Sequence, residues 1–122
     1  MRRIPAVCAF LVMAMASAFA GEAAGDWDRT DGKGSVRFAL CGEAYCGVIT
    51  KINEPSATAK IGQQVFFAMK RTGENTWAGS AFNPEDGKTY SGKMTMSGNS
   101  LTTAGCVFGG LICKSVSWRR AQ

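Results

Sequence analysis

The sequence predicts an all-β protein: a small antiparallel up-and-down barrel of eight strands with two local disulfides. Three observations support this prediction. Short segments alternate apolar and polar residues, turn-forming residues separate them, and four of the five cysteines fall in two close pairs. No apolar stripe recurs at the helical period over a length that predicts a stable helix.

The N-terminus has the features of a secretory signal peptide. Arg2 and Arg3 precede an apolar stretch that ends in a small-x-small motif, which predicts cleavage between Ala20 and Gly21. The stretch has about 16 residues, fewer than the roughly 20 that a membrane-spanning helix needs. We therefore expect a cleaved signal peptide at 1–20 and a single domain at 21–122. That domain would be periplasmic or secreted and would not span the membrane.

Eight segments have the length and the alternation of strands. In residues 88–97, Tyr90, Gly92, Met94 and Met96 share one face, and hydroxyl residues and Lys93 share the other. A strand with one apolar face is typical of an antiparallel sheet. The predicted strands are residues 25–30, 35–41, 45–52, 63–70, 76–82, 88–97, 100–106 and 111–119. We also expect one helical turn at residues 56–61, in the longest connection.

The connections carry turn residues that suit successive hairpins. Residues 31–34 contain Asp-Gly-Lys-Gly, and residues 83–87 contain proline and glycine where a type I turn places them. Successive hairpins form a meander, and closing a meander removes its two exposed edges. The pattern therefore favours a closed barrel over an open sheet.

The mature cysteines are Cys41, Cys46, Cys106 and Cys113. In an up-and-down barrel, successive connections alternate between the two ends, so the two pairs lie at opposite ends. The predicted disulfides are therefore local, Cys41 with Cys46 and Cys106 with Cys113. Zinc is the rival interpretation, but the spacing is wrong and the chain has no histidine. Disulfides in a short exported chain indicate an oxidising compartment.

The first and last strands of a closed barrel are neighbours. Trp27 near the start can then meet Arg119 or Arg120 near the end, in a barrel-closing contact between a guanidinium and an indole. The Gly-x-Trp opening and the late arginine are similar to those of lipocalin-like and calycin-like barrels.

A distinctive motif occupies residues 83–90, with the sequence Asn-Pro-Glu-Asp-Gly-Lys-Thr-Tyr. It is accompanied by Gly25-x-Trp27, Cys41-Gly42, Cys46-Gly47, Trp77-x-Gly79, Leu101, Gly105-Cys106, Leu111-x-Cys113 and Trp118-x-Arg120. Together these features resemble the bacterial exported family called domain of unknown function 2147. The resemblance implies a small secreted or periplasmic β domain, and it brings no catalytic residues with it.

The residue inventory argues against an enzyme. The absence of histidine excludes Ser-His-Asp and Cys-His nucleophile systems, and the cysteines are expected to be oxidised. Glu85 and Asp86 are interpreted as turn residues. We expect no catalytic residue, no cofactor and no metal site. Without Arg2 and Arg3 the net charge is about +3 and the basic residues are scattered, so nucleic-acid binding is not expected.

Two functions remain. The first is binding of a small apolar or amphiphilic ligand in a shallow cup at one mouth of a mostly filled barrel. The candidate lining residues are Phe38, Phe67, Trp77, Tyr90, Met94 and Lys114. The second is interaction with an envelope protein through the loop at 83–88, which contains Asn83, Glu85, Asp86 and Lys88.

Lys114 has the parity of the apolar face of the last predicted strand. It is either a counter-charge for an acidic ligand such as a fatty acid, or a lysine whose stem lies on apolar surface while its tip reaches water. A bulge after Cys113 would also explain its position.

Overall fold

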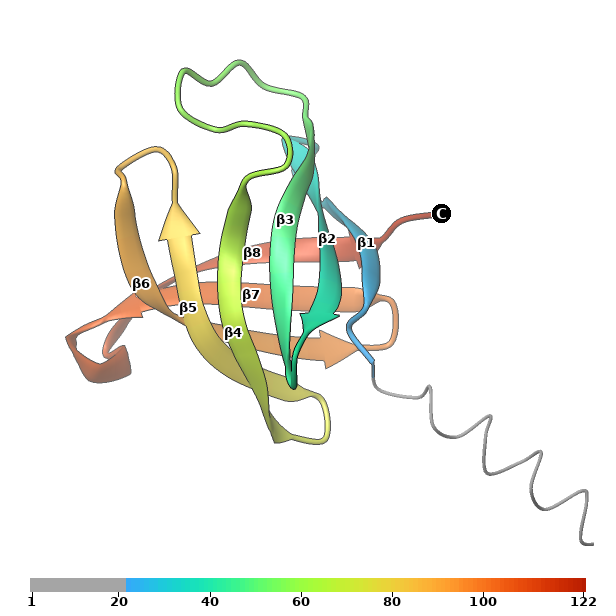
Figure 1. Cartoon of the computed structure of the whole chain (residues 1–122), viewed down its shortest axis with the longest axis vertical. Coiled ribbons are helices and arrows are strands. Elements are labelled where there is room, and N and C mark those ends of the chain that lie inside the picture. The colour runs from blue at the N-terminus through green and yellow to red at the C-terminus, as the bar shows by residue number, and fades with distance from the viewer. Residues whose placement is uncertain (1–21) are drawn as a thin grey trace, which may run out of the picture.

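The computed structural model describes residues 22–122, in which eight antiparallel strands pair in chain order and close into a barrel (Figure 1). The predicted signal peptide at 1–20 and the cleavage site between Ala20 and Gly21 lie outside the described residues. The strands are β1 (Gly25–Arg29), β2 (Gly34–Cys41), β3 (Ala44–Ile52), β4 (Gln64–Gly73), β5 (Thr76–Asn83), β6 (Lys88–Ser97), β7 (Ser100–Val107) and β8 (Ile112–Arg120).

The predicted strands and the closed barrel are confirmed, with small shifts in the boundaries. Closure is made by β1 and β8, in which Trp27 lies opposite Arg120 and Arg29 lies opposite Trp118. In residues 22–122, no helix is long and apolar enough to cross a membrane.

The helical turn expected at residues 56–61 is wrong. Residues 53–63 form bends and a turn. The Ser56 hydroxyl accepts hydrogen bonds from the backbone N–H groups of Thr58 (3.3 Å) and Ala59 (2.9 Å). Because this side chain satisfies the backbone locally, it replaces the hydrogen bonds of a helix. A short 3-10 turn, η1 (Phe108–Gly110), instead precedes β8.

The two disulfides are local, as predicted, and join Cys41 to Cys46 and Cys106 to Cys113. The first closes the β2–β3 hairpin and the second closes the β7–β8 hairpin. We call the end with the β2–β3, β4–β5 and β6–β7 turns the closed end. The end with the β1–β2, β3–β4, β5–β6 and β7–β8 connections is the open end.

Strand β4 contains a bulge that overturns one expectation. Phe66 and Met69 are both buried, and the pairing with β5 shifts between Phe67 and Lys70. Two residues therefore stand between two inward ones, and Phe67, expected to face inward, lies outside with 38% of its surface exposed. A Cβ at Gly79 would lie 2.4 Å from the Ala68 carbonyl oxygen, so the bulge requires glycine on β5.

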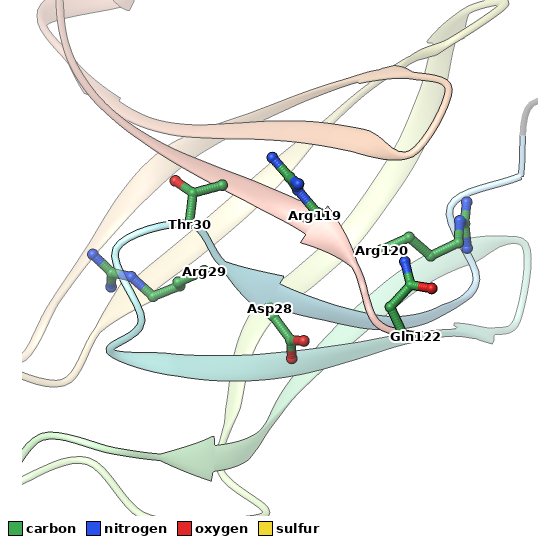
Figure 2. Close-up of a pocket in the computed structure, with 6 residues that line it drawn as sticks. All are labelled: Asp28, Arg29, Thr30, Arg119, Arg120 and Gln122. Carbon is green, nitrogen blue, oxygen red and sulfur yellow. The ribbon is translucent and has the colours of Figure 1, made fainter.

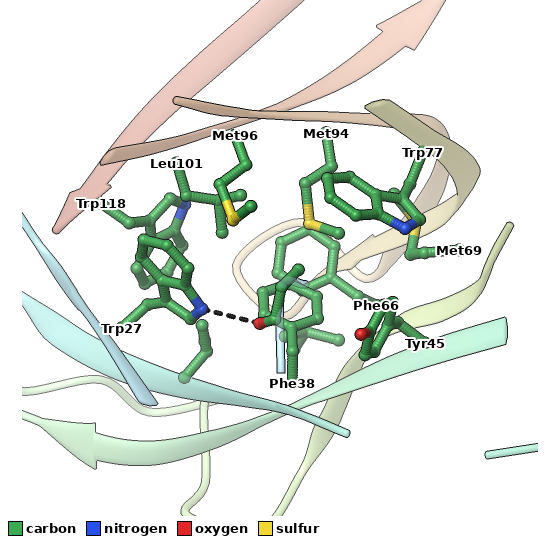
Figure 3. Packing of buried hydrophobic residues seen from close by; sticks show 13 residues of the cluster. Trp27, Phe38, Tyr45, Phe66, Met69, Trp77, Met94, Met96, Leu101 and Trp118 are labelled. Carbon is green, nitrogen blue, oxygen red and sulfur yellow. Dashed lines mark hydrogen bonds between the residues drawn. The ribbon is translucent and has the colours of Figure 1, made fainter. Parts of the chain in front are cut away.

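Large side chains fill the closed half of the barrel (Figure 3). They lie near the three turns of the closed end, and they are Trp27, Phe38, Tyr45, Met69, Trp77, Met94, Met96 and Leu101. Residues 22–24 cover this end. Ala23 is fully buried, and its carbonyl accepts a 2.9 Å hydrogen bond from the indole nitrogen of Trp27. The closed half is therefore a solid core.

Candidate ligand-binding site

A cavity of about 820 Å³ lies at the open end of the barrel. All eight strands contribute to its wall, and the β3–β4 and β5–β6 connections contribute to its rim. The site is therefore built by the closure of the barrel and not by one local segment.

The floor of the cavity is apolar. Its buried residues include Val36, Val65, Phe66 and Trp118. The Trp118 indole N–H donates a 2.9 Å hydrogen bond to the Thr103 hydroxyl, which also lies at the floor. In the part of the chain that the structure describes, every buried side-chain nitrogen and oxygen has a hydrogen-bond partner. The floor thus offers no free polar side-chain group, and it therefore suits an apolar part of a ligand.

The wall above the floor includes small and β-branched residues and the ring of Tyr90. Ile49, Ala81 and Val116 are partly buried there. Tyr90 lies opposite Ala81 in the β5–β6 pair, and a Cβ at Gly105 would come within 3.3 Å of the Tyr90 Cβ. Small residues on both sides of Tyr90 therefore leave room for its ring, and they leave the rest of this half open.

The rim carries charges of both signs. The Lys33 ammonium lies 4.0 Å from the Glu54 carboxylate. Glu85 accepts hydrogen bonds from the hydroxyl groups of Ser56 (2.7 Å) and Thr58 (3.3 Å). These bonds tie the β5–β6 loop to the β3–β4 connection, so these two parts of the rim support each other.

Tyr90 and Asp86 form a hydrogen-bonded pair at the rim, with the phenol donating to the carboxylate. This bond, together with the Lys88 backbone N–H at 2.9 Å, lowers the pKa of Asp86 below its usual value. The same bond raises the pKa of Tyr90. Near neutral pH the carboxylate is therefore ionised and the phenol is neutral, so neither group is poised to transfer a proton.

Lys114 lies opposite Gly105 in the β7–β8 pair, and it lines the cavity near the mouth. Its side chain is exposed. Within residues 22–122, its ammonium group makes no ion pair or hydrogen bond to a side chain. A positive charge without a protein partner thus stands between the apolar wall and the solvent.

The residues of the 83–88 loop hold the loop in shape. The Asn83 side-chain oxygen accepts the Glu85 backbone N–H at 2.9 Å, and Asp86 does the same for Lys88. Asn83, Glu85 and Asp86 also line the cavity. The loop therefore forms part of the mouth.

The candidate lining residues from the sequence fall into three groups. Tyr90 and Lys114 line the cavity. Phe38, Trp77 and Met94 face inward but lie in the filled half, and Phe67 is outside because of the bulge. Lining residues that were not singled out include Val36, Ile49, Val65, Phe66, Thr103 and Val116. These residues lie on the inward face in the half of each strand nearer to the open end. Their position along the strands is the signal in the sequence that could have identified them.

The two late arginines occupy different places (Figure 2). The Arg120 guanidinium lies 4.2 Å from the Trp27 ring centroid and donates to the carbonyls of Ala24 (3.0 Å) and Glu22 (3.1 Å). Both arginines line a shallow depression of about 380 Å³ beside Asp28, but no ring contact or hydrogen bond of this kind is seen for Arg119 in residues 22–122. Arg120 is thus the residue that holds the closed end.

Comparison with known proteins gives a family and a fold. The family described as "Uncharacterized protein conserved in bacteria (DUF2147)" matches residues 25–120. A solved structure is similar, protein HP1028 from Helicobacter pylori, which is described as belonging to the lipocalin family. It has 18% sequence identity and a TM-score of 0.71, with 83% of this chain and 84% of that chain covered. No curated protein matches the sequence significantly.

Proposed function

The chain belongs to the DUF2147 family of bacterial proteins, and we propose that it is an exported, non-enzymatic protein that binds a small amphiphilic molecule. The apolar part of the ligand occupies the open half of the barrel, and an acidic head group lies at the rim beside Lys114. The observation that carries this proposal is the cavity of about 820 Å³ above an apolar floor.

The size and the chemistry of the cavity agree with such a ligand. Pockets that hold small molecules commonly enclose about 300–1,000 Å³ and are mostly apolar, with a few polar groups that orient the ligand. Here the apolar surface is at the floor, and the polar groups, Lys114 and Tyr90 among them, are at the mouth. An amphiphile with its chain inward and its head outward satisfies both regions.

Lys114 favours an acidic head group over a neutral one. Its ammonium has no protein counter-ion among the described residues, so a ligand carboxylate or phosphate would gain attraction without breaking an ion pair. The other cavity-lining cation near the mouth with no salt bridge in residues 22–122 is Lys51. The nearby carboxylate of Asp86 already accepts the Tyr90 hydroxyl.

The proposed location outside the cytoplasm agrees with the two local disulfides, which persist in oxidising compartments. Interaction of the 83–88 loop with an envelope protein has less support. The carboxylates of Glu85 and Asp86 are engaged by Ser56 and Tyr90 within the mouth itself.

A titration of the delipidated domain with a fluorescent polyene fatty acid tests the proposal. We expect saturable binding of one molecule and competition by unlabelled fatty acids. Absence of saturable binding would reject the proposed function.

Two pairs of variants locate the site. Ala81→Phe adds a ring to the cavity wall and should weaken binding by about tenfold or more. Ser80→Phe adds the same ring on the other face of β5 and should leave binding unchanged. Lys114→Met should remove the preference for a fatty acid over the alcohol of the same length, whereas Lys93→Met, on the outer face of β6, should not. Equal binding by Ala81→Phe and the unmodified protein would place the ligand elsewhere.

A further inference from the structure

Three large apolar side chains project into solvent from one turn of the barrel. Phe108, Leu111 and Ile112, which we call the apolar tip, are 74%, 86% and 59% exposed. They belong to the β7–β8 hairpin, whose turn stands out from the barrel wall (Figure 1). Single exposed apolar residues are common on protein surfaces, but three within five residues form a patch that indicates an interaction site.

The turn holds this patch in a costly conformation. Phe108 has a φ of 55°, in the left-handed region that bulky residues avoid, and Gly109 and Gly110 continue in that region. The Cys106–Cys113 disulfide closes the hairpin below the turn. An exposed phenylalanine gains nothing from burial that would offset this strain. Its presence therefore indicates that the exposed ring has a partner outside the protein.

The charges around the tip are positive. No aspartate or glutamate follows Asp86 in the sequence, whereas residues 87–122 contain Lys88, Lys93, Lys114, Arg119 and Arg120. The Lys93 ammonium lies 3.6 Å from the position that a Cβ at Gly110 would take, so it sits directly beside the turn. Lys114 follows the disulfide on the other strand. An apolar tip between two lysines suits a lipid bilayer, because the bilayer interior is apolar and its head groups can be anionic.

We propose that the apolar tip inserts into the interface of a bilayer of anionic phospholipids, with Lys93 and Lys114 beside the head groups. The area of the tip favours a lipid partner over a protein partner, because a stable protein interface buries about 800 Å² on each partner. The three side chains on a convex turn offer a much smaller area. They are sufficient for insertion into a lipid interface when nearby lysines are attracted to anionic head groups.

The docked protein approaches the bilayer with its β6–β8 side. The β5–β6 loop carries Glu85 and Asp86 at the same open end, and an anionic surface would repel them. Ile112 and Lys114 belong both to the region of the tip and to the cavity wall. Docking would therefore bring the mouth of the cavity next to the lipids. The docking itself does not depend on the proposed ligand.

Sedimentation with vesicles tests the proposal. The domain with intact disulfides is mixed with vesicles of phosphatidylglycerol and phosphatidylethanolamine, or of phosphatidylcholine alone. We expect at least about tenfold stronger partitioning to the anionic vesicles and its loss at high salt. Leu111→Trp should show a blue shift of its added fluorescence on anionic vesicles only.

Substitutions in the apolar tip test whether its side chains make the contact with the bilayer. Phe108→Asn with Leu111→Ser should reduce partitioning by about tenfold without lowering the melting temperature, because asparagine tolerates the left-handed conformation. Ile61→Ser is the matched control, since Ile61 is 68% exposed on the β3–β4 connection. Undiminished sedimentation of the double variant, or no preference for anionic vesicles, would overturn the proposal. Binding of fatty acid in solution is measured separately, so the two proposals can fail independently.

Discussion

At the closed end, aromatic rings and methionines fill the barrel, whereas at the open end smaller inward side chains such as Val36, Ala81 and Val116 leave a cavity above the rings of Phe66 and Trp118. The same eight strands supply both sets. On β2, for example, Phe38 belongs to the filled half and Val36 to the cavity wall. One continuous barrel thus combines a tightly packed half with a hollow half.

The closed end is also sealed from outside. The Tyr45 hydroxyl donates to the Glu22 carboxylate, whose other oxygen lies 3.2 Å from the Arg71 guanidinium. Arg71 in turn lies 4.8 Å from the Trp77 ring centroid. The open end has no such cover in the described residues, and its cavity therefore remains accessible.

The largest expected contrast comes from removing one side chain from each half. Leu101→Ala deletes a side chain that is 1% exposed in the filled half, and it should lower the free energy of unfolding by about 2–5 kcal/mol. Val116→Ala in the cavity wall should cost roughly 1 kcal/mol or less, because that side chain already borders open space. Urea unfolding with intact disulfides measures both. Equal losses would contradict the division of the barrel into two halves.

The two disulfides provide the next comparison. Replacing either pair by alanines should lower the free energy of unfolding by about 2–2.5 kcal/mol, because both loops are small. Only the Cys106→Ala and Cys113→Ala variant should also lose partitioning to anionic vesicles, since that bridge shapes the apolar tip. Loss of vesicle partitioning by the Cys41→Ala and Cys46→Ala variant would break the comparison.

Adjacent arginines on β8 give a smaller contrast. Arg120→Lys keeps the charge but loses the fork that reaches the carbonyls of Ala24 and Glu22, so we expect a loss of about 1–3 kcal/mol. Arg119→Lys, on the outer wall, should change the unfolding free energy by less than about 0.5 kcal/mol. Thermal unfolding of both variants measures the difference. Similar melting temperatures would contradict a role of Arg120 in stabilising the closed end.

The last contrast is a pH dependence at the closed end. Burial, with the bond to Glu22 adding to it, raises the pKa of Tyr45 to about 12. The fold favours the neutral phenol, so this stabilisation is complete below the unfolded pKa of about 10 and is lost as the pH rises through about 12. Unfolding free energies measured across that range should fall more steeply for the native domain than for Tyr45→Phe. Parallel slopes for the two proteins would contradict the assignment.

Alternation and turn residues were sufficient to predict the strands, the closure and the disulfide pairing. The pairing followed because the topology puts Cys41 and Cys106 at opposite ends. The position of Phe67 could not be predicted, since parity assumes a regular strand and the bulge at Ala68 resets it. Only the pairing of β4 with its neighbours reveals that bulge.

The cavity was harder to place than the barrel. Parity assigns Phe38, Trp77 and Met94 to the inward face, and their positions along the strands place them toward the closed end. Neither observation shows which end is filled, because that depends on residues 22–24, which cover the closed end through hydrogen bonds with Trp27 and Arg120. Such contacts between distant parts of the chain are not encoded in any local pattern. The register of β8 is regular after Cys113, so no bulge is needed to explain that Lys114 lines the cavity.

Strand β1 begins and strand β8 finishes at the closed end, where the Arg120 backbone N–H donates to the Asn99 carbonyl of the β6–β7 turn at 2.8 Å. The start of β1 and the end of β8 therefore both lie at the end of the barrel opposite the cavity. A sensor chip that holds the protein by a tag after Gln122 would present the mouth and the apolar tip to the flowing solution. The proposed binding of fatty acids and of vesicles can then be tested on one oriented layer of molecules.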